Sequence, residues 1–366
     1  MLRWVWHPQF HSDVKSRESM RAGRKITSIF LFFSFMLISF VAIEKKHNAK
    51  VVLNTSHHQN YTAETDSFQI FINIYCQLSK SIDSVSKIIE VVNLNDSNIK
   101  RRIEISTAEI EELENLKNLK HSVINNLRTC SRKITGSKAI VFNGVKYHLF
   151  VADLDSVDVK THLIHIKSKT TLGQVKSFLE MQKRVPLMIT NAGMFTPSYE
   201  PEGLYIEENS LKKYPLDVGD QKSNLNFYLR PNGVFYINAK NIPHIDSTQE
   251  FRRLQRLGKL KIKLATQSGP MLVINGRIHP AFLKGSFNQK IRSGVGILHT
   301  KKIVFAATLD GSNFYDFAVF FRDVLNCKNA LFLDGAISKM YLHDIDSTET
   351  GGQFGPVISV SRKGKK

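Results

Sequence analysis

Apolar residues follow three different patterns along the chain. Residues 26–43 read ITSIFLFFSFMLISFVAI, a run of 18 residues without a charge. From Phe68 to Val92, apolar residues recur at alternating spacings of three and four positions. Beyond residue 137 they form short runs that Gly, Asn and Pro interrupt. These patterns predict a membrane-spanning helix, a helical segment and a domain of mixed strands and helices, in that order.

The first pattern predicts a transmembrane anchor at 26–43. At about 1.5 Å per residue, the run is just long enough to cross the hydrocarbon core of a bilayer. It is apolar on every side and flanked by Arg24–Lys25 and Lys45–Lys46, which argues against a helix buried in a soluble core. A cleaved signal peptide is the alternative. The 25 residues before the run and the lack of a small-x-small cleavage site after it favour an uncleaved anchor.

Basic residues are unevenly distributed about this run, with six Lys or Arg in the leader 1–25 and three in residues 44–50. Cytoplasmic flanks of membrane helices carry the excess of Lys and Arg. We therefore predict a single-pass membrane protein whose leader is cytoplasmic and whose main domain is periplasmic or otherwise extracytoplasmic. Residues 44–65 are polar and are interpreted as a linker.

The second pattern predicts two helices in residues 66–133. The spacings from Phe68 to Val92 form the a/d seam of a coiled coil. The turn-forming residues 93–98 break this seam, and Ser106 with Glu109 fits a capping box at the start of a second helix. We expect a helical hairpin or coiled-coil stalk that serves as a spacer or as a surface for self-association.

The third pattern predicts one α+β domain over residues 137–366, with twisted, mainly antiparallel mixed sheets and packed helices. Strands do not alternate strictly with helices, and no linker-like stretch divides the segment. Helices are expected at 171–184, 247–257 and 315–326. Strands are expected at Ala139–Phe142, Tyr147–Val151, His162–Ile166, Leu187–Ile189, Val234–Ile237, Met271–Ile274, Val295–Leu298, Ile303–Ala307 and Ala330–Leu333.

The formal net charge of +19 is spread over the whole chain. A diffuse positive charge raises encounter rates with polyanions but identifies no partner. The sequence has no zinc-finger spacing, no basic recognition helix and no aromatic-rich single-strand motif, so we predict no nucleic-acid partner. Three cysteines are too few for a disulfide framework. A Cys76–Cys130 bridge is conceivable, but three free thiols are the expectation.

Four segments of the third region combine glycines and polar residues with apolar runs, an arrangement common at functional sites. They are Ile189-Thr-Asn-Ala-Gly-Met-Phe195 with Pro201-Glu-Gly-Leu-Tyr205, Ala265-Thr-Gln-Ser-Gly-Pro-Met-Leu272 with the hairpin turn Asn275-Gly276, Ile291-Arg-Ser-Gly-Val-Gly296, and Thr308-Leu-Asp-Gly311 with Leu333-Asp-Gly-Ala-Ile-Ser-Lys-Met340. In this order the motifs resemble the phosphodiester glycosidase family, across residues 137–360. Ala336 departs from the Asp-Gly-Gly-x-Ser of the eukaryotic branch, and the last motif is closer to bacterial members.

The resemblance implies a reaction and a substrate class. The family includes the uncovering enzyme of the mannose 6-phosphate pathway, which removes N-acetylglucosamine from a phosphodiester, and bacterial proteins linked to exopolysaccharide. The chain is therefore expected to cleave the bond between a sugar's anomeric carbon and a phosphodiester oxygen. This chemistry requires stabilisation of an oxocarbenium-like centre, neutralisation of the phosphate, and a carboxylate that acts as nucleophile or base.

Three carboxylates are the candidate catalytic residues. Asp334 follows an apolar run and precedes Gly335, so we expect it at a strand end as nucleophile or general base, with a helix or turn cap as its alternative role. Asp310 stands in a similar Leu-Asp-Gly turn and is either a second catalytic carboxylate or only a turn former. Glu202 follows the first motif and is expected as the acid, unless it is an ordinary exposed loop residue.

The candidate substrate-binding residues belong to the same motifs. Arg292 offers a planar, charged fork for phosphate oxygens, with an ion pair to one of the aspartates as the alternative. Asn191 is expected to bind sugar hydroxyls, unless it only forms a left-handed turn. The remaining candidates supply hydrogen bonds or allow close approach of the backbone: Gly193, Gln267, Ser268, Gly269, Gly335 and Ser338.

No metal or other cofactor is predicted, because the 13 histidines form no H-E-x-x-H motif; calcium held by loop carboxylates stays an open alternative. The sequence therefore predicts a membrane-anchored hydrolase that acts on a sugar-phosphodiester or polysaccharide substrate in the cell envelope. A glycan-binding or sugar-phosphate-binding protein without catalysis, which assists exopolysaccharide assembly, is the second hypothesis. A scaffold built around the helical segment is the third.

Overall fold

The computed structural model describes residues 63–95, 99–164, 168–208, 213–219 and 226–363, and within α2 and α3 the side chains of 67–87 and from 110 onward. Tyr61–Lys366 form one compact unit. The predicted leader, the anchor at 26–43 and nearly all of the linker lie outside the described residues. In the part of the chain that is described, no helix is both long and apolar enough to cross a membrane.

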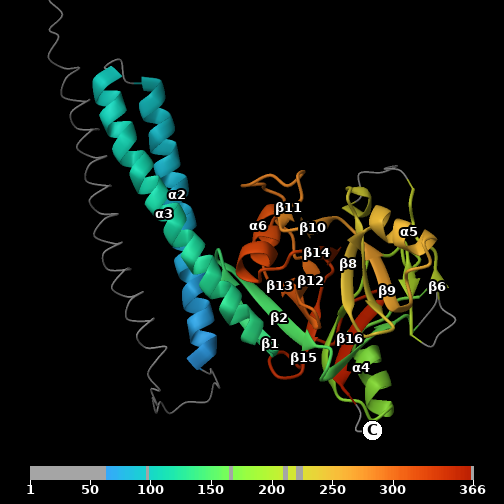
Figure 1. Ribbon diagram of the computed structural model, residues 1–366. Coiled ribbons are helices and arrows are strands. Elements are labelled where there is room, and N and C mark those ends of the chain that lie inside the picture. Colours follow the sequence, from blue (N-terminus) through green and yellow to red (C-terminus); the bar gives the residue numbers. More distant parts are fainter. Residues whose placement is uncertain (1–62, 96–98, 165–167, 209–212, 220–225, 364–366) are drawn as a thin grey trace, which may run out of the picture. The chain divides into compact units, whose positions relative to one another are not determined.

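Two long helices, α2 (Ala63–Asn95) and α3 (Ile99–Lys133), run side by side as a hairpin (Figure 1). The break between them falls within the predicted residues 93–98. The predicted start of the second helix near Ser106 is wrong, because α3 already begins at Ile99. Good helix formers such as Lys100, Arg101 and Glu104 extend the helix, so Ser106 is an interior residue rather than an N-cap.

The seam of α2 is buried within this chain. Phe68 and Leu78 are at most 2% exposed, and the ring of Tyr75 lies 6.1 Å from that of Phe142 in the adjoining sheet. The Tyr75 hydroxyl also donates a buried hydrogen bond to Asp323. This part of the hairpin therefore belongs to the folded domain and is not a free stalk. Self-association through residues 66–133 stays a prediction.

In the described part of the chain, sixteen strands form three antiparallel sheets. The seven-stranded sheet has the order β1 (Gly136–Phe142), β2 (Val145–Asp153), β13 (Lys302–Thr308), β12 (Ser293–His299), β14 (Ala330–Asp334), β10 (Met271–Ile274) and β11 (Arg277–Ile278). The four-stranded sheet has the order β15 (Met340–Leu342), β4 (Pro186–Asn191), β16 (Val357–Arg362) and β3 (Val157–His162). The five-stranded sheet has the order β6 (Lys213–Tyr214), β5 (Tyr205–Ile206), β9 (Ile262–Ser268), β7 (Gly233–Asn238) and β8 (Pro243–Ser247).

The shorter helices confirm the three expected helical segments. They are α4 (Leu172–Met181), α5 (Thr248–Arg256) and α6 (Phe314–Val319), which continues as the π-helix η2 (Phe320–Val324); a 3-10 turn, η1 (Asn226–Tyr228), precedes β7. Thr171 and Gln174 form a capping box at the start of α4, and Ser247 caps α5. These caps satisfy amide groups that have no partner within a helix.

One hydrophobic core joins the three sheets. It takes Phe305 and Leu331 from the seven-stranded sheet, Ile358 from the four-stranded sheet, and Phe235 and Leu264 from the five-stranded sheet. Strands such as β13, which reads KIVFAAT, are apolar almost throughout because neighbouring elements cover both faces. The predicted α+β class with mainly antiparallel sheets and packed helices is thus confirmed.

The expected strands agree with the structure except at His162–Ile166. There β3 ends at His162. The strand covers Val157–His162 because these residues pair with the remote strand β16. The predicted hairpin turn at Asn275-Gly276 is confirmed: it joins β10 to β11, and both residues have positive φ, 49° and 80°.

Replacing Tyr75 by Phe should destabilise the docked hairpin. The change removes the hydroxyl that donates to the buried Asp323 carboxylate. We expect the free energy of unfolding, measured by urea denaturation, to fall by about 1–3 kcal/mol. Tyr199→Phe is the control, because the Tyr199 hydroxyl bonds only the exposed Gln353 and its loss should cost less than about 0.5 kcal/mol. Equal losses in both variants would contradict the docking contact.

Candidate active site

Strand ends from all three sheets meet beside Asp334. Ser293, the first residue of β12, lies opposite Asp334, the last residue of β14. Ser268, at the end of β9, donates a hydrogen bond of 2.8 Å to the carbonyl of Leu333. Asn191, at the end of β4, donates one of 2.8 Å to the Ser293 hydroxyl. The sequence motifs around these residues are therefore neighbours in space.

Three polar side chains form a buried hydrogen-bonded chain in this region. Asn191 donates to Ser293, and the hydroxyls of Ser293 and Ser338 lie 2.8 Å apart. The Asn191 side-chain oxygen accepts the backbone amide of Lys339 at 3.3 Å. Asn191 is a strand residue, so the alternative of a left-handed turn is wrong. Ser293 was missed in the sequence, although it stands inside the Arg-x-Gly motif.

Two of the predicted glycines are needed for close packing. A Cβ at Gly193 would collide with the carbonyl of Gln267, and one at Gly269 would lie 2.5 Å from the Asn232 Cβ. The amide of Gly193 donates to the Thr266 hydroxyl at 3.0 Å. These glycines bring the loop after β4 against the end of β9, which is a structural role.

The Gln267 side chain is buried and bonded to the protein, so it is not free to bind a substrate. Its side-chain oxygen accepts the amides of Leu204 and Asp217, each at 2.9 Å. Its side-chain nitrogen donates to the Asp217 carbonyl at 2.7 Å and to the Thr248 hydroxyl at 3.1 Å. An amide side chain has about four hydrogen-bonding positions, so none is left for a ligand. The predicted contact of Gln267 with phosphate or sugar is therefore not supported by its geometry.

Asp334 is a partly buried carboxyl at the end of β14. Burial raises its pKa to about 6, and the Gly335 amide, which donates to it at 2.6 Å, acts in the opposite direction. In the described residues no helix follows Asp334, so it caps none, but its bond to the Gly335 amide lies at the start of the turn after β14 and fits the turn half of its alternative role. A Cβ at Gly335 would meet only the Phe332 ring, at 3.7 Å, so this turn leaves room beside the carboxyl. A carboxyl poised near neutrality can serve as a nucleophile or a general base.

Arg292 is buried, and its guanidinium is held by neutral groups. It stacks 3.7 Å above the Phe314 ring and donates to the carbonyls of Ser312 at 2.6 Å and Asn288 at 2.9 Å. Among the described residues no carboxylate forms an ion pair with it, so the predicted alternative of a pair with an aspartate is wrong. Burial lowers its pKa to about 10, which still leaves it charged at neutral pH. The guanidinium is therefore not freely exposed to a ligand. Its charge nevertheless has no counterion in the described chain.

Glu202 belongs to a cluster with Asp217 and Tyr228 that the sequence did not reveal. The Tyr228 hydroxyl lies 3.0 Å from the Asp217 carboxylate and 3.3 Å from that of Glu202. Burial and the hydrogen bond to Asp217 raise the pKa of Tyr228 to about 12. The Asp217 amide binds Gln267, the residue before Ser268, which links this cluster to the end of β9. Asp217 and Tyr228 stand outside any regular pattern, so the sequence carried no signal for them.

Asp310 is placed differently from the other candidates. Its carboxylate is exposed and accepts the Lys146 amide at 3.1 Å, which ties the turn after β13 to the start of β2. In the described chain, no hydrogen bond or ion pair joins it to the residues around Asp334. This contact is structural, and a catalytic role for Asp310 stays a prediction.

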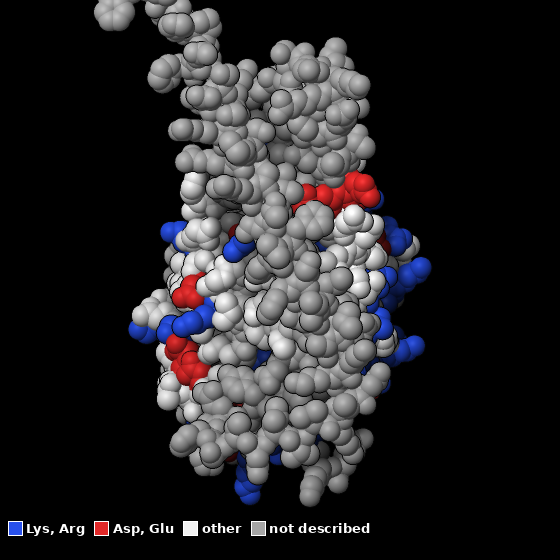
Figure 2. Space-filling model, turned by 90° about the vertical axis from the view of Figure 1, so that its left-hand side faces the viewer, with Lys and Arg blue, Asp and Glu red and all other residues white. Residues whose placement is uncertain are grey.

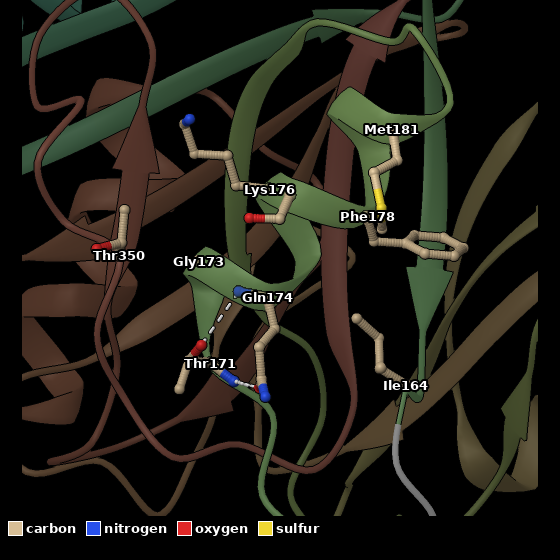
Figure 3. Close-up of a pocket in the computed structure, with 9 residues that line it drawn as sticks. Ile164, Thr171, Gly173, Gln174, Lys176, Phe178, Met181 and Thr350 are labelled. Atoms are coloured by element: carbon tan, nitrogen blue, oxygen red, sulfur yellow. Dashed lines mark hydrogen bonds between the residues drawn. The ribbon is translucent and has the colours of Figure 1, made fainter.

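A groove of about 680 Å³ beside α4 lies apart from these residues (Figure 3). Figure 3 shows Thr350 at one end and Ile164 with Phe178 at the other. Its charged residue, Lys176, pairs with Glu180 at 2.6 Å. No candidate carboxylate lines it, so it offers no groups for glycoside hydrolysis.

Charged side chains are spread over the described surface that Figure 2 shows. On the face in Figure 2, basic side chains lie at both margins of the described surface with acidic ones nearby, as a diffuse charge predicts. Within the described ranges, no three His, Cys, Asp or Glu side chains are grouped closely enough to hold a metal ion. Cys76 and Cys327 are free thiols, so the Cys76–Cys130 bridge is not formed.

Comparison with known proteins agrees with this arrangement of motifs. Residues 186–360, which hold Asn191, Ser268, Ser293 and Asp334, match the family model of the phosphodiester glycosidase. The matched segment is slightly less than half of the chain and is similar to phosphodiester glycosidase domains. Strands β4 to β16 fall almost wholly within this segment, whereas α2, α3 and β1–β3 precede it.

Two relatives illustrate how far the similarity reaches. The domain resembles "Uncharacterized protein YigE" of Escherichia coli strain K12, with 38% identity over 179 residues, or 48% of this chain and 66% of that protein. The chain thus spans slightly less than two thirds of this relative's length. The solved catalytic domain of zebrafish N-acetylglucosamine-1-phosphodiester alpha-N-acetylglucosaminidase, auto-inhibited by its pro-peptide, gives a TM-score of 0.43 and 15% identity. That similarity covers 62% of this chain and 82% of the zebrafish domain and is too distant to support an argument of its own.

The raised pKa of Asp334 predicts how its charge affects stability. The folded pKa of about 6 exceeds the unfolded value near 4, so the folded chain binds more protons between these values. Stability contributed by Asp334 therefore falls as the pH rises from about 4 to about 6. The side chain in Asp334→Asn cannot become charged. Above this pH range the free energy of unfolding of the variant should therefore be larger than that of the parent, by on the order of 2 kcal/mol.

Urea denaturation of both proteins across this pH range measures the difference. The two should converge near pH 4, where Asp334 is protonated in the parent. A variant that is less stable than the parent near pH 8 would contradict the burial of this carboxyl.

Proposed function

We propose that the chain is a membrane-anchored hydrolase of the cell envelope that cleaves the glycosidic bond of a sugar-1-phosphodiester. In this reaction water adds across the bond between the anomeric carbon and the phosphate oxygen. The sugar leaves with a free hydroxyl, and the phosphate becomes a monoester. The observation that carries the proposal is the Asp334 carboxyl, held among hydrogen-bonding groups where strand ends of a domain similar to phosphodiester glycosidases meet.

Asp334 acts as nucleophile or general base. With a pKa of about 6 it is ionised at neutral pH, yet it retains affinity for a proton. The open turn at Gly335 leaves room for the reacting carbon beside it. The Ser338 hydroxyl is an uncharged group suited to sugar hydroxyls. The Asn191 amide instead holds the strand ends together, because its four hydrogen-bonding positions are taken by Thr190, Ala192, Ser293 and Lys339.

Arg292 supplies the positive charge for the phosphodiester. Its charge is not neutralised by any described carboxylate, and the Phe314 ring and two carbonyls fix its position. A cation fixed in a partly dry region attracts an anion more strongly than one in bulk water. Because the guanidinium is buried, the contact is electrostatic rather than the open fork expected from the sequence.

Glu202 acts as the general acid toward the leaving phosphate. The single hydroxyl proton of Tyr228 cannot serve both neighbouring carboxylates, at 3.0 Å and 3.3 Å, equally well. The shorter of the two bonds goes to Asp217, so Glu202 is the carboxyl of the pair that is more available to the leaving oxygen.

The two Leu-Asp-Gly turns provide a matched test of catalysis. Asp334→Asn should lower kcat for release of reducing sugar from an N-acetylglucosamine-1-phosphodiester on the order of 10³-fold. Asp310→Asn should stay within about threefold of the parent, because its carboxylate only holds the Lys146 amide. In the parent, kcat/KM should fall tenfold per pH unit below about 6.

The result separates the two hypotheses for this domain. A parent that binds the diester but does not turn it over would favour a sugar-phosphate-binding protein. Loss of activity in Asp310→Asn with activity kept in Asp334→Asn would contradict the assignment of the catalytic carboxylate.

The anchor is tested by fractionation of cells that make the chain. We expect the full chain to stay with membranes after an alkaline carbonate wash, since residues 26–43 form an uncharged apolar run. A chain without residues 1–43 should move to the soluble fraction. Release of the full chain would contradict the anchor, and a mature chain that starts after residue 43 would support the signal peptide.

A further inference from the structure

A second groove, of about 580 Å³, lies between the β5–β6 pair and α5. Its apolar lining comes from Leu204, Ile206 and Leu216, which rest on or belong to a small hydrophobic cluster beneath. Its basic lining residues are Lys213 and Arg252, both exposed to solvent. An apolar surface with cations on its rim suits a ligand that has both an apolar part and a negative charge.

The two cations of this groove have no counterion within the described residues. On the same helix, Arg253 pairs with Glu250 at 2.7 Å, and on the neighbouring strand Lys263 pairs with Glu208 at 3.4 Å. Among the residues that the structure describes, acidic side chains therefore neutralise nearby cations but not the two that line the groove. Their free charge is available to an anionic ligand.

The groove and the Glu202–Tyr228–Asp217 cluster are built partly from the same two segments of chain. Leu204, which lines the groove, stands two residues after Glu202, and Asp217 lies between the lining residues Leu216 and Val218. The amides of Leu204 and Asp217 both donate to the side-chain oxygen of Gln267 at 2.9 Å, which holds the two segments together.

We propose that this groove binds the aglycone of the phosphodiester, and that the preferred aglycone carries a second phosphate beyond an apolar segment. The proposal rests on the proposed function, in which Glu202 delivers its proton to the leaving phosphate. A general acid stands on the leaving-group side of the scissile bond, so the substituent of that phosphate extends into the space next to Glu202. Arg252 and Lys213 then bind the second phosphate, and the apolar lining contacts the segment between the two.

Two N-acetylglucosamine-1-phosphodiesters test this specificity in the full chain, one with a methyl aglycone and one with a 6-phosphohexyl aglycone. The parent should show a KM at least tenfold lower for the phosphohexyl diester, with similar kcat. Arg252→Gln should remove most of this preference and leave the methyl diester unchanged. Arg277→Gln is the matched control, because it removes one exposed Arg on β11, away from the groove, and should keep the preference.

A binding measurement keeps this proposal separate from the reaction itself. Calorimetry with 1,6-hexanediol bisphosphate should show binding to the parent and to Arg277→Gln, and at least tenfold weaker binding to Arg252→Gln. Binding that depends on Arg252 without turnover of either diester would overturn the proposed reaction and retain the anion-binding groove. Turnover with no effect of Arg252→Gln on KM, or equal calorimetric affinities in all three proteins, would overturn the groove.

Discussion

The hydrogen bonds between strand ends are the constraint on which the candidate site depends. Asn191, Ser293 and Ser338 join β4, β12 and the turn after β14, while Ser268 of β9 binds the carbonyl before Asp334. All four side chains are buried, so the loss of one leaves a partner unsatisfied at a cost of about 1–3 kcal/mol. These bonds fix Asp334 where it is dry enough for a raised pKa and open enough on the Gly335 side to meet a substrate.

The site combines a fixed cation with two carboxylates that share one tyrosine hydroxyl. The charge of Arg292 is stabilised by an aromatic ring and two carbonyls, which hold it without neutralising it. Around Tyr228, two carboxylates compete for one hydroxyl proton. Gln267 connects these parts, because its amide group binds the Asp217 segment while the next residue, Ser268, binds the Asp334 strand. A phosphodiester of a sugar needs both features: attraction for its charge and a proton for the leaving oxygen.

The sequence predicted the strongly apolar strands, the three short helices and the Asn275-Gly276 turn, since local pattern decides these elements. It missed β9 and β16, which read IKLATQS and VISVSR, because polar residues interrupt them and their partners are remote in the chain. The motifs showed which parts of the sequence form the site. They did not show which of its side chains have hydrogen-bonding positions free for a ligand. Gln267 and Arg292 resemble ligands in a sequence, yet neighbouring groups occupy the hydrogen-bonding positions of Gln267, and the Arg292 guanidinium is buried against the Phe314 ring and two carbonyls. Such occupancy depends on tertiary contacts that no local pattern records.

The most direct test of the proposed reaction is to determine which bond of the phosphodiester is broken. Hydrolysis of an N-acetylglucosamine-1-phosphodiester in ¹⁸O-labelled water places the label on whichever atom water attacks. Attack at the anomeric carbon beside Asp334 predicts that the label appears in the released sugar and that the phosphomonoester stays unlabelled, as mass spectrometry of both products would show. Label in the phosphate would mean that the phosphorus–oxygen bond is cleaved, and it would contradict a glycosidase reaction at this site.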